Sequence, residues 1–125
     1  MAEIGREEDG MSFREAVDRL HAQYLDAFRR RDAVGAAAGY TEDAVYLTGG
    51  EPVRGRAAIA AAVAAYWKSG VVEKGLTTLS AEAEGNLGYV LETVETSAGK
   101  GTALLVLRRD GQGRWGICAE AFFEK

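Results

Sequence analysis

The stretch LGYVLETVETSAGKGTALLVLRRDGQGRWGICAEAFFEK, residues 87–125, decides the fold because it alternates β-rich runs with very short breaks. A similar run precedes it across the segment EGN, and the later breaks are AGK and DGQG. Breaks of this length join antiparallel neighbours, so a β-meander is predicted. The four runs that form its strands are Val71 to Glu84, Leu87 to Ser97, Gly101 to Arg109, and Arg114 to Phe123.

Upstream of the meander, apolar residues recur at helical spacing. SFRE offers Ser12 and Glu15 as a capping box, which predicts an amphipathic helix of about 18 residues. Asp32 can cap a short second helix through AVGAAAGY, residues 33–40, and residues 56–70 predict a third, with a short strand from Ala44 to Leu47 between them. Helices followed by a meander predict an α+β domain whose helices cover one face of a curved sheet.

Length and composition limit the domain organisation and the cellular setting. The chain has 125 residues, which suits a single domain with one core. Residues 1–11 are charged and aperiodic, so we predict a flexible N-terminal tail followed by one domain over residues 12–125. The first ten residues are too charged for a signal peptide, and a cytoplasmic location is expected.

Several partner classes have no support in the sequence. The net charge is −4, and no basic run exceeds three residues, so nucleic-acid binding is not expected. No apolar stretch reaches the roughly 20 residues of a membrane span. Cys118 is the single cysteine and His21 the single histidine, which makes a metal site unexpected.

Three segments together resemble a known family: AVDRLHAQYLDAFRRRD (16–32), YTEDAVYLTGGEPVRGRAAI (40–59) and LRRDGQGRWGICAEAFFEK (107–125). In their order and spacing these segments are similar to those of the NTF2-like superfamily. Within it, they resemble the SnoaL-like and ketosteroid-isomerase-like group, and the chain resembles a small domain of the DUF4440 type. The resemblance implies a cone in which three N-terminal helices pack on a curved antiparallel sheet and enclose a pocket. The superfamily carries many unrelated activities, so the fold alone does not give the function.

The resemblance can be followed residue by residue into the ketosteroid isomerase site. Tyr24 occupies the position of the tyrosine that donates a hydrogen bond to the substrate oxygen. Thr48 stands where the general-base aspartate would be, and threonine cannot take up a proton at neutral pH. Leu105 replaces the protonated aspartate that is the second donor. Ketosteroid isomerase chemistry of the known design is therefore not expected.

The same alignment turns alternate residues of the last three strands toward the pocket. Glu92 and Glu120 are then two carboxylates in an otherwise apolar cavity, where desolvation would raise their pKa toward neutrality and suit them to acid/base catalysis. A slip of one residue in register would instead place them in solvent or at an interface, and a salt bridge to Arg54 or Arg56 is a third interpretation. The residues predicted to face inward are Val90, Glu92, Val94, Ala103, Leu105, Leu107, Cys118, Glu120 and Phe122.

Other residues have two interpretations at this stage. Tyr24 is either a pocket residue or a core tyrosine, while Tyr46, Tyr66 and Trp67 are typical packing residues that would also suit a flat apolar ligand. His21 is predicted on the helix surface. With Tyr24, Glu92 and Glu120 as the candidate catalytic residues, the candidate ligand-binding residues are Tyr46, Thr48, Trp67, Val90, Leu105, Leu107, Cys118 and Phe122.

The functional expectation is a small-molecule pocket protein. Its activity would be that of an isomerase, cyclase or hydrolase acting on an apolar, polyketide- or steroid-like metabolite without a metal or organic cofactor. A non-catalytic binder of an apolar ligand and an oligomerisation module remain alternatives. Because the last strand is apolar on both faces, a homodimer through the outer face of the sheet is expected.

Overall fold

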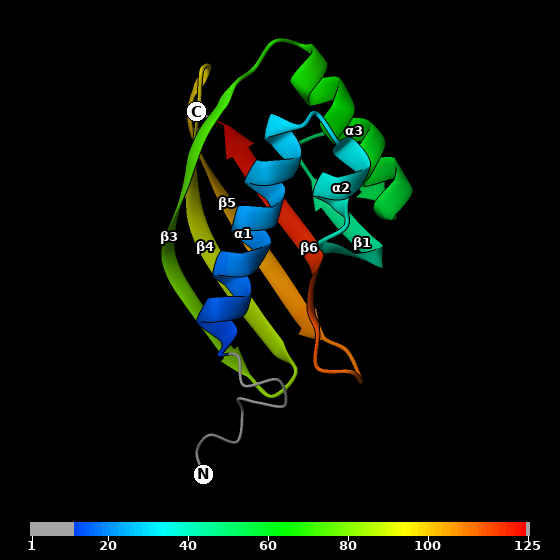
Figure 1. Cartoon of the computed structure of the whole chain (residues 1–125), viewed down its shortest axis with the longest axis vertical. Helices are drawn as coiled ribbons and strands as arrows, with labels where there is room; N and C mark the ends of the chain where they lie inside the picture. Colours follow the sequence, from blue (N-terminus) through cyan, green and yellow to red (C-terminus); the bar gives the residue numbers. More distant parts are fainter. Residues whose placement is uncertain (1–11, 125) are drawn as a thin grey trace.

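The fold is described from a computed structural model over residues 12–124, so the predicted tail, residues 1–11, lies outside the described residues. Figure 1 shows three helices packed beside a curved sheet in this part of the chain. The elements, in chain order, are α1 (Phe13–Arg29), α2 (Ala33–Ala37), β1 (Tyr40–Leu47), β2 (Val53–Arg54), α3 (Arg56–Lys68), β3 (Glu73–Glu84), β4 (Leu87–Thr96), β5 (Gly99–Arg109) and β6 (Trp115–Glu124).

The helix boundaries follow from local capping chemistry. In α1 the predicted capping box is present, because Ser12 Oγ accepts from the Glu15 backbone N–H and the Glu15 carboxylate accepts from that of Ser12. Asp32 caps α2 by accepting from the Gly35 backbone N–H at 2.9 Å. Gly70 follows the end of α3 with φ 98°, a left-handed conformation that glycine adopts without steric cost.

The sheet has the strand order β2-β1-β6-β5-β4-β3. Strands β3 to β6 pair antiparallel with their sequence neighbours, so the predicted meander is confirmed. The expectation of a purely antiparallel sheet is wrong at one place, because β1 runs parallel to β6. Parallel pairing requires a long crossover, and here α3 with the first three meander strands separates the two partners in sequence.

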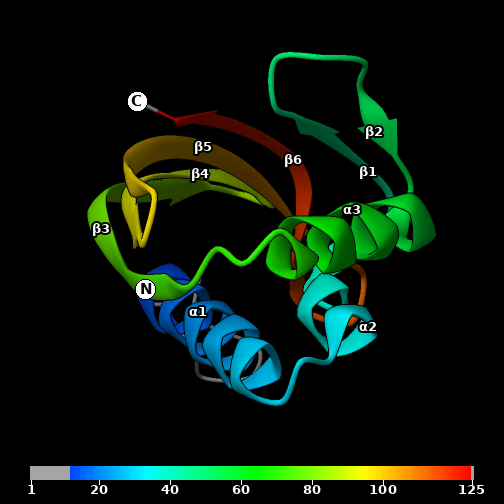
Figure 2. The same ribbon diagram turned by 90° about the horizontal axis from the view of Figure 1, so that it is seen from above.

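The helices lie on the concave side of the sheet, as the view from above shows (Figure 2). An apolar core lies between these layers, and its most deeply buried large side chains are Val17, Ile59, Val90 and Leu107. The α+β class predicted from the sequence is therefore confirmed. None of the helices in residues 12–124 combines the length and apolar character needed to cross a bilayer.

Candidate functional site

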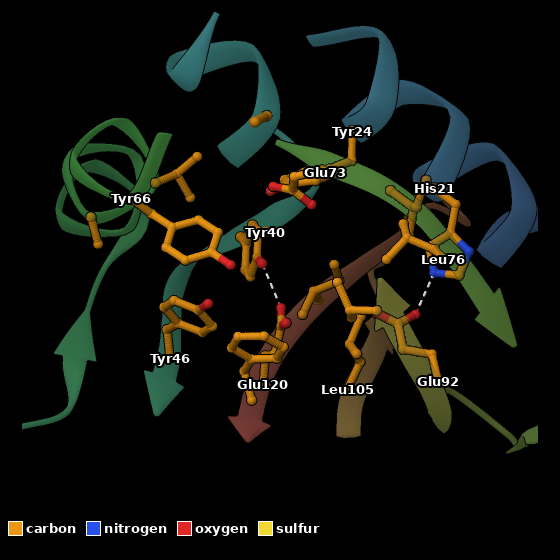
Figure 3. A pocket seen from close by; sticks show the side chains of 18 of the residues that line it. His21, Tyr24, Tyr40, Tyr46, Tyr66, Glu73, Leu76, Glu92, Leu105 and Glu120 are labelled. Carbon is orange, nitrogen blue, oxygen red and sulfur yellow. Dashed lines mark hydrogen bonds and ion pairs between the residues drawn. The ribbon is translucent and has the colours of Figure 1, made fainter. Parts of the chain in front are cut away.

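A cavity of about 550 Å³ lies between the helices and the concave face of the sheet. Its walls come from all three helices and all six strands, so residues distant in sequence converge on it. Figure 3 shows several of their side chains pointing into the same space. The predicted site residues among the lining are Tyr24, Tyr46, Thr48, Val90, Glu92, Leu105, Leu107, Glu120 and Phe122.

Two predicted site residues, Cys118 and Trp67, do not line this cavity. A β-bulge explains the first: Ala119 pairs with Val106 and Ile117 with Leu107, so Cys118 is the extra residue and Ile117 takes the inward position. Trp67 is buried, and its indole nitrogen donates to the Glu73 carboxylate at 2.9 Å. Trp67 therefore supports the cavity wall from behind through Glu73, whereas Cys118 is a half-buried bulge residue outside the lining.

Glu120 extends into the cavity from the middle of β6, opposite Leu105 of β5. Its Oε1 accepts a hydrogen bond of 2.5 Å from the hydroxyl of Tyr40 (Figure 3). Burial raises the pKa of Glu120 from 4.5 to about 7, with further increases from the charges of Glu92 and Glu73. The Tyr40 hydrogen bond and His21 act in the opposite direction. This carboxyl group can thus exchange a proton close to neutral pH.

Glu92, on β4, is only 3 % exposed and is paired with His21 of α1. His21 Nε2 and Glu92 Oε1 are 2.6 Å apart, across the cavity wall shown in Figure 3. The surface position predicted for His21 is therefore wrong. The residue follows Val17 by four positions, which is one turn along the apolar face, and this spacing was the sequence signal for an inward side chain.

A third carboxylate, Glu73, was not anticipated from the sequence. Its Oε2 accepts hydrogen bonds from both the Tyr24 hydroxyl and the Trp67 indole. Burial and the negative charge of Glu73 raise the pKa of Tyr24 well above its ordinary value. Because Glu73 pairs with Thr96, on the same face of β4 as Glu92, its inward direction depends on strand register.

Four tyrosines contribute rings to the cavity: Tyr24, Tyr40, Tyr46 and Tyr66. Tyr40 was missed because it was assigned to the end of the second helix, whereas it begins β1. Tyr40 and Tyr46 are an even number of residues apart on β1, so strand alternation places both on the cavity side, although the register with β6 shifts between Tyr40 and Val45. Burial, together with the charge of Glu120, raises the pKa of the Tyr46 hydroxyl.

The exposed lining residues Thr48, Ser69 and Glu124 indicate where the cavity opens. At this end the Tyr66 hydroxyl, on α3, donates to the Glu124 carboxylate of β6 at 3.4 Å. The suggested salt bridge with Arg54 or Arg56 is not present among the described contacts. Arg56 instead donates to the backbone carbonyl of Tyr40 at 2.9 Å, and neither arginine lines the cavity.

No group of three or more histidine, cysteine, aspartate or glutamate side chains within residues 12–124 is arranged to hold a metal ion. The titratable side chains of the described lining carry carboxyl, phenol and imidazole groups. Among these side chains, the carboxyl group of Glu120 has a pKa that burial raises to about 7. Glu120 is therefore the strongest acid/base candidate.

Comparison with known proteins places this architecture in a family. The SnoaL-like domain family matches residues 21–116, which is most of the chain, and the chain belongs to this family. The predicted NTF2-like relationship is thereby confirmed, and the finer DUF4440 assignment stays a prediction. No curated protein matches the sequence.

Many solved structures share the fold. A cystatin-like-fold domain of unknown function from Nostoc punctiforme is 24% identical, with a TM-score of 0.78 over 90% of this chain and 77% of that one. An NTF2-like protein with a cystatin-like fold from Novosphingobium aromaticivorans is 21% identical, with a TM-score of 0.70 over 89% and 80%. A ketosteroid isomerase-like protein from Erwinia carotovora atroseptica is 21% identical, with a TM-score of 0.67 over 86% and 92%. At these identities the similarity establishes the fold and no activity.

Proposed function

We propose that the protein binds a small, largely apolar molecule in its cavity and transfers a proton to or from it through Glu120. The activity would be that of an isomerase, cyclase or hydrolase. The observation that carries the proposal is the position of Glu120 inside the cavity, hydrogen bonded to Tyr40, with its pKa raised to about 7. A group with this pKa is both a competent acid and a competent base at neutral pH.

The residues around Glu120 would bind the ligand and orient it. The apolar body of the ligand would contact Val90, Leu105 and Leu107 on the floor of the cavity. Tyr24 was expected to donate a hydrogen bond to the ligand, but its hydroxyl proton is engaged by Glu73. Tyr46 makes no hydrogen bond among the described residues, so its hydroxyl is the free phenol for orienting a ligand.

The test measures the pKa of Glu120 directly, by carboxyl-carbon NMR with Glu120→Gln for assignment. An apparent pKa near 7 supports proton transfer at physiological pH. A value near 4.5 would leave Glu120 fully ionised at neutral pH and remove its role as an acid. Glu84, exposed at the end of β3, gives the matched solvent-exposed reference signal.

A non-catalytic binder is the second candidate, favoured by the internal hydrogen bonds of the pocket side chains. Tyr24, Trp67 and His21 are all bound to glutamates, which rigidifies the wall without leaving these donors for chemistry. Catalysis and non-catalytic binding are distinguished by whether a bound ligand is converted. Conversion of a bound ligand by the wild type but not by Glu120→Gln supports catalysis, whereas binding without conversion supports the binder.

We also propose that the protein is a homodimer through the outer face of the sheet. The support is an apolar row across four adjacent strands on the side away from the helices, formed by residues that pair in register. Exposed apolar surface of this kind marks interaction sites in soluble proteins. The row consists of Leu91, Leu104, Ala121 and Leu47.

A further inference from the structure

The charges that face the cavity are almost all of one sign. Within residues 12–124, four glutamates line it, and they come from β3, β4 and β6. The only described lining residue able to carry a positive charge is His21, since no lysine or arginine within residues 12–124 contributes to the wall. The four glutamates are Glu73, Glu92, Glu120 and Glu124.

The three inner glutamates each have one oxygen engaged and one free. The engaged oxygens are Glu73 Oε2, Glu92 Oε1 and Glu120 Oε1. Their second oxygens accept no hydrogen bond from the described part of the chain. Glu92 is 97 % removed from solvent, so an unsatisfied carboxylate oxygen there is costly until a donor reaches it.

The tyrosines make the cavity still richer in electron density, because of the direction of their hydrogen bonds. Tyr24, Tyr40 and Tyr66 donate their hydroxyl protons to Glu73, Glu120 and Glu124. At these three residues a ligand therefore meets phenol lone pairs and ring faces, both of which are electron-rich, whereas Tyr46 keeps a free hydroxyl donor. Such surfaces attract cations, and the effect is strongest where water is excluded.

We propose that the ligand of this cavity carries a positively charged nitrogen, either a protonated amine or a quaternary ammonium, on an apolar body. The inference rests on the proposed small-molecule function of the same cavity and names its ligand class. The cation sits between the free oxygens of Glu92 and Glu120, within reach of the tyrosine rings, while the apolar body contacts the floor. Carboxylate and phosphate ligands are disfavoured because the wall repels them.

Binding of such a cation is coupled to the protonation of Glu120. The groups that influence this carboxyl are Tyr40 and Tyr46 from β1, Glu73 from β3, Glu92 from β4, and His21 and Tyr24 from α1. The ionised form of Glu120 attracts the cation and the neutral form does not. Affinity for a cation without titratable groups therefore rises with pH through the Glu120 pKa of about 7.

The experiment compares three probes that share a phenyl body: benzyltrimethylammonium, benzyl methyl ether and phenylacetate. Binding is followed by protein-detected NMR at about pH 8 and constant ionic strength. We expect the cation to bind about tenfold more tightly than the neutral ether, and phenylacetate to bind least. Glu92→Gln and Glu120→Gln should weaken only the cation, whereas Glu82→Gln, at an exposed position outside the lining, should change nothing.

The outcomes separate the inference from the function on which it rests. Equal or tighter binding of the neutral ether overturns the cation inference and leaves the pocket function standing. Failure of all three probes to bind at millimolar concentration counts against both. If the variants do not fold, the wild type still decides: its affinity for the quaternary probe must increase between pH 6 and pH 8, and a flat or falling profile overturns the inference.

Discussion

Glu120 is ionisable, yet it occupies a strand position that most proteins would fill with an apolar residue. Its neighbours across the sheet are Leu105 on β5 and Tyr46 on β1, and both line the cavity with it. The single hydrogen bond from Tyr40 offsets part of the desolvation cost without abolishing it. A carboxyl group retained under these conditions destabilises the fold when ionised, which is a common property of functional residues.

This cost predicts a pH-dependent effect of Glu120→Gln on stability. The folded-state pKa is raised from 4.5 to about 7, so the folded protein holds the proton that the unfolded chain releases over this range. Wild-type stability therefore falls as pH rises from about 4.5 to 7, by up to about 3 kcal/mol. The variant lacks this loss, so its free energy of unfolding relative to the wild type should increase across the same range.

Urea unfolding at about pH 5 and about pH 8 measures the difference. Glu84→Gln, an exposed glutamate on β3, is the matched control and should show little change between the two conditions. A wild-type minus Glu120→Gln difference that is constant with pH would contradict the desolvation of Glu120.

At the residue scale, the sequence predicted the inward direction of Glu92 and Glu120, because simple alternation holds on β4 and on the end of β6. It failed for Cys118, where a bulge interrupts the alternation, and for Glu73, which lies beside a register shift. A bulge leaves no trace in a hydrophobic pattern. These positions could be found only once the strand pairing was known.

At the scale of single elements, α1 is the helix that contributes most polar groups to the cavity. It places His21 against Glu92 and Tyr24 against Glu73, so two of the three inner carboxylates depend on its position. Its N-terminus is fixed by the Ser12 capping box, and Phe13 packs edge-on against Trp115 with ring centroids 4.8 Å apart. Capping at one end of α1 thus helps to hold the site.

Removal of this cap should destabilise the protein measurably. Ser12→Ala deletes the acceptor for the Glu15 backbone N–H and should lower the free energy of unfolding by about 1 kcal/mol. Ser12→Asp restores an acceptor at the same position and should recover most of the loss. Chemical denaturation of the two variants provides the measurement, and equal stability of Ser12→Ala and the wild type would show that the cap contributes nothing.

The elements themselves were largely predictable. Helical spacing and capping residues located α1, α2 and α3, and turn segments separated β3, β4, β5 and β6. The start of β1 at Tyr40 was missed because the preceding alanine- and glycine-rich segment has weak periodicity. Its parallel contact with β6 could not be predicted, since residues 40–47 and 115–124 share no local signal of pairing.

At the scale of the whole molecule, the proposed dimer makes the outer sheet face a buried surface. Leu104 lies in the middle of this face on β5 and is 43% exposed in the single chain. Leu104→Lys would bring two charges into an apolar interface and should convert a dimer into a monomer. Size-exclusion chromatography with light scattering measures the change.

The control for this prediction is Val34→Lys, which adds the same charge on α2. Val34 is 75% exposed and lies on a helix, away from the sheet, so the variant should keep the oligomeric state of the wild type. A monomeric wild type at high concentration would remove the dimer proposal.

The parallel contact between β1 and β6 also determines when the sheet can be completed during synthesis. The wall that carries Tyr40 and Tyr46 joins the sheet through β6, which follows every other strand in the sequence. Contacts this distant along the chain form late and slow folding. A nascent chain that has emerged only as far as β5 therefore has no assembled binding site, and its exposed β5 edge is a natural client surface for chaperones.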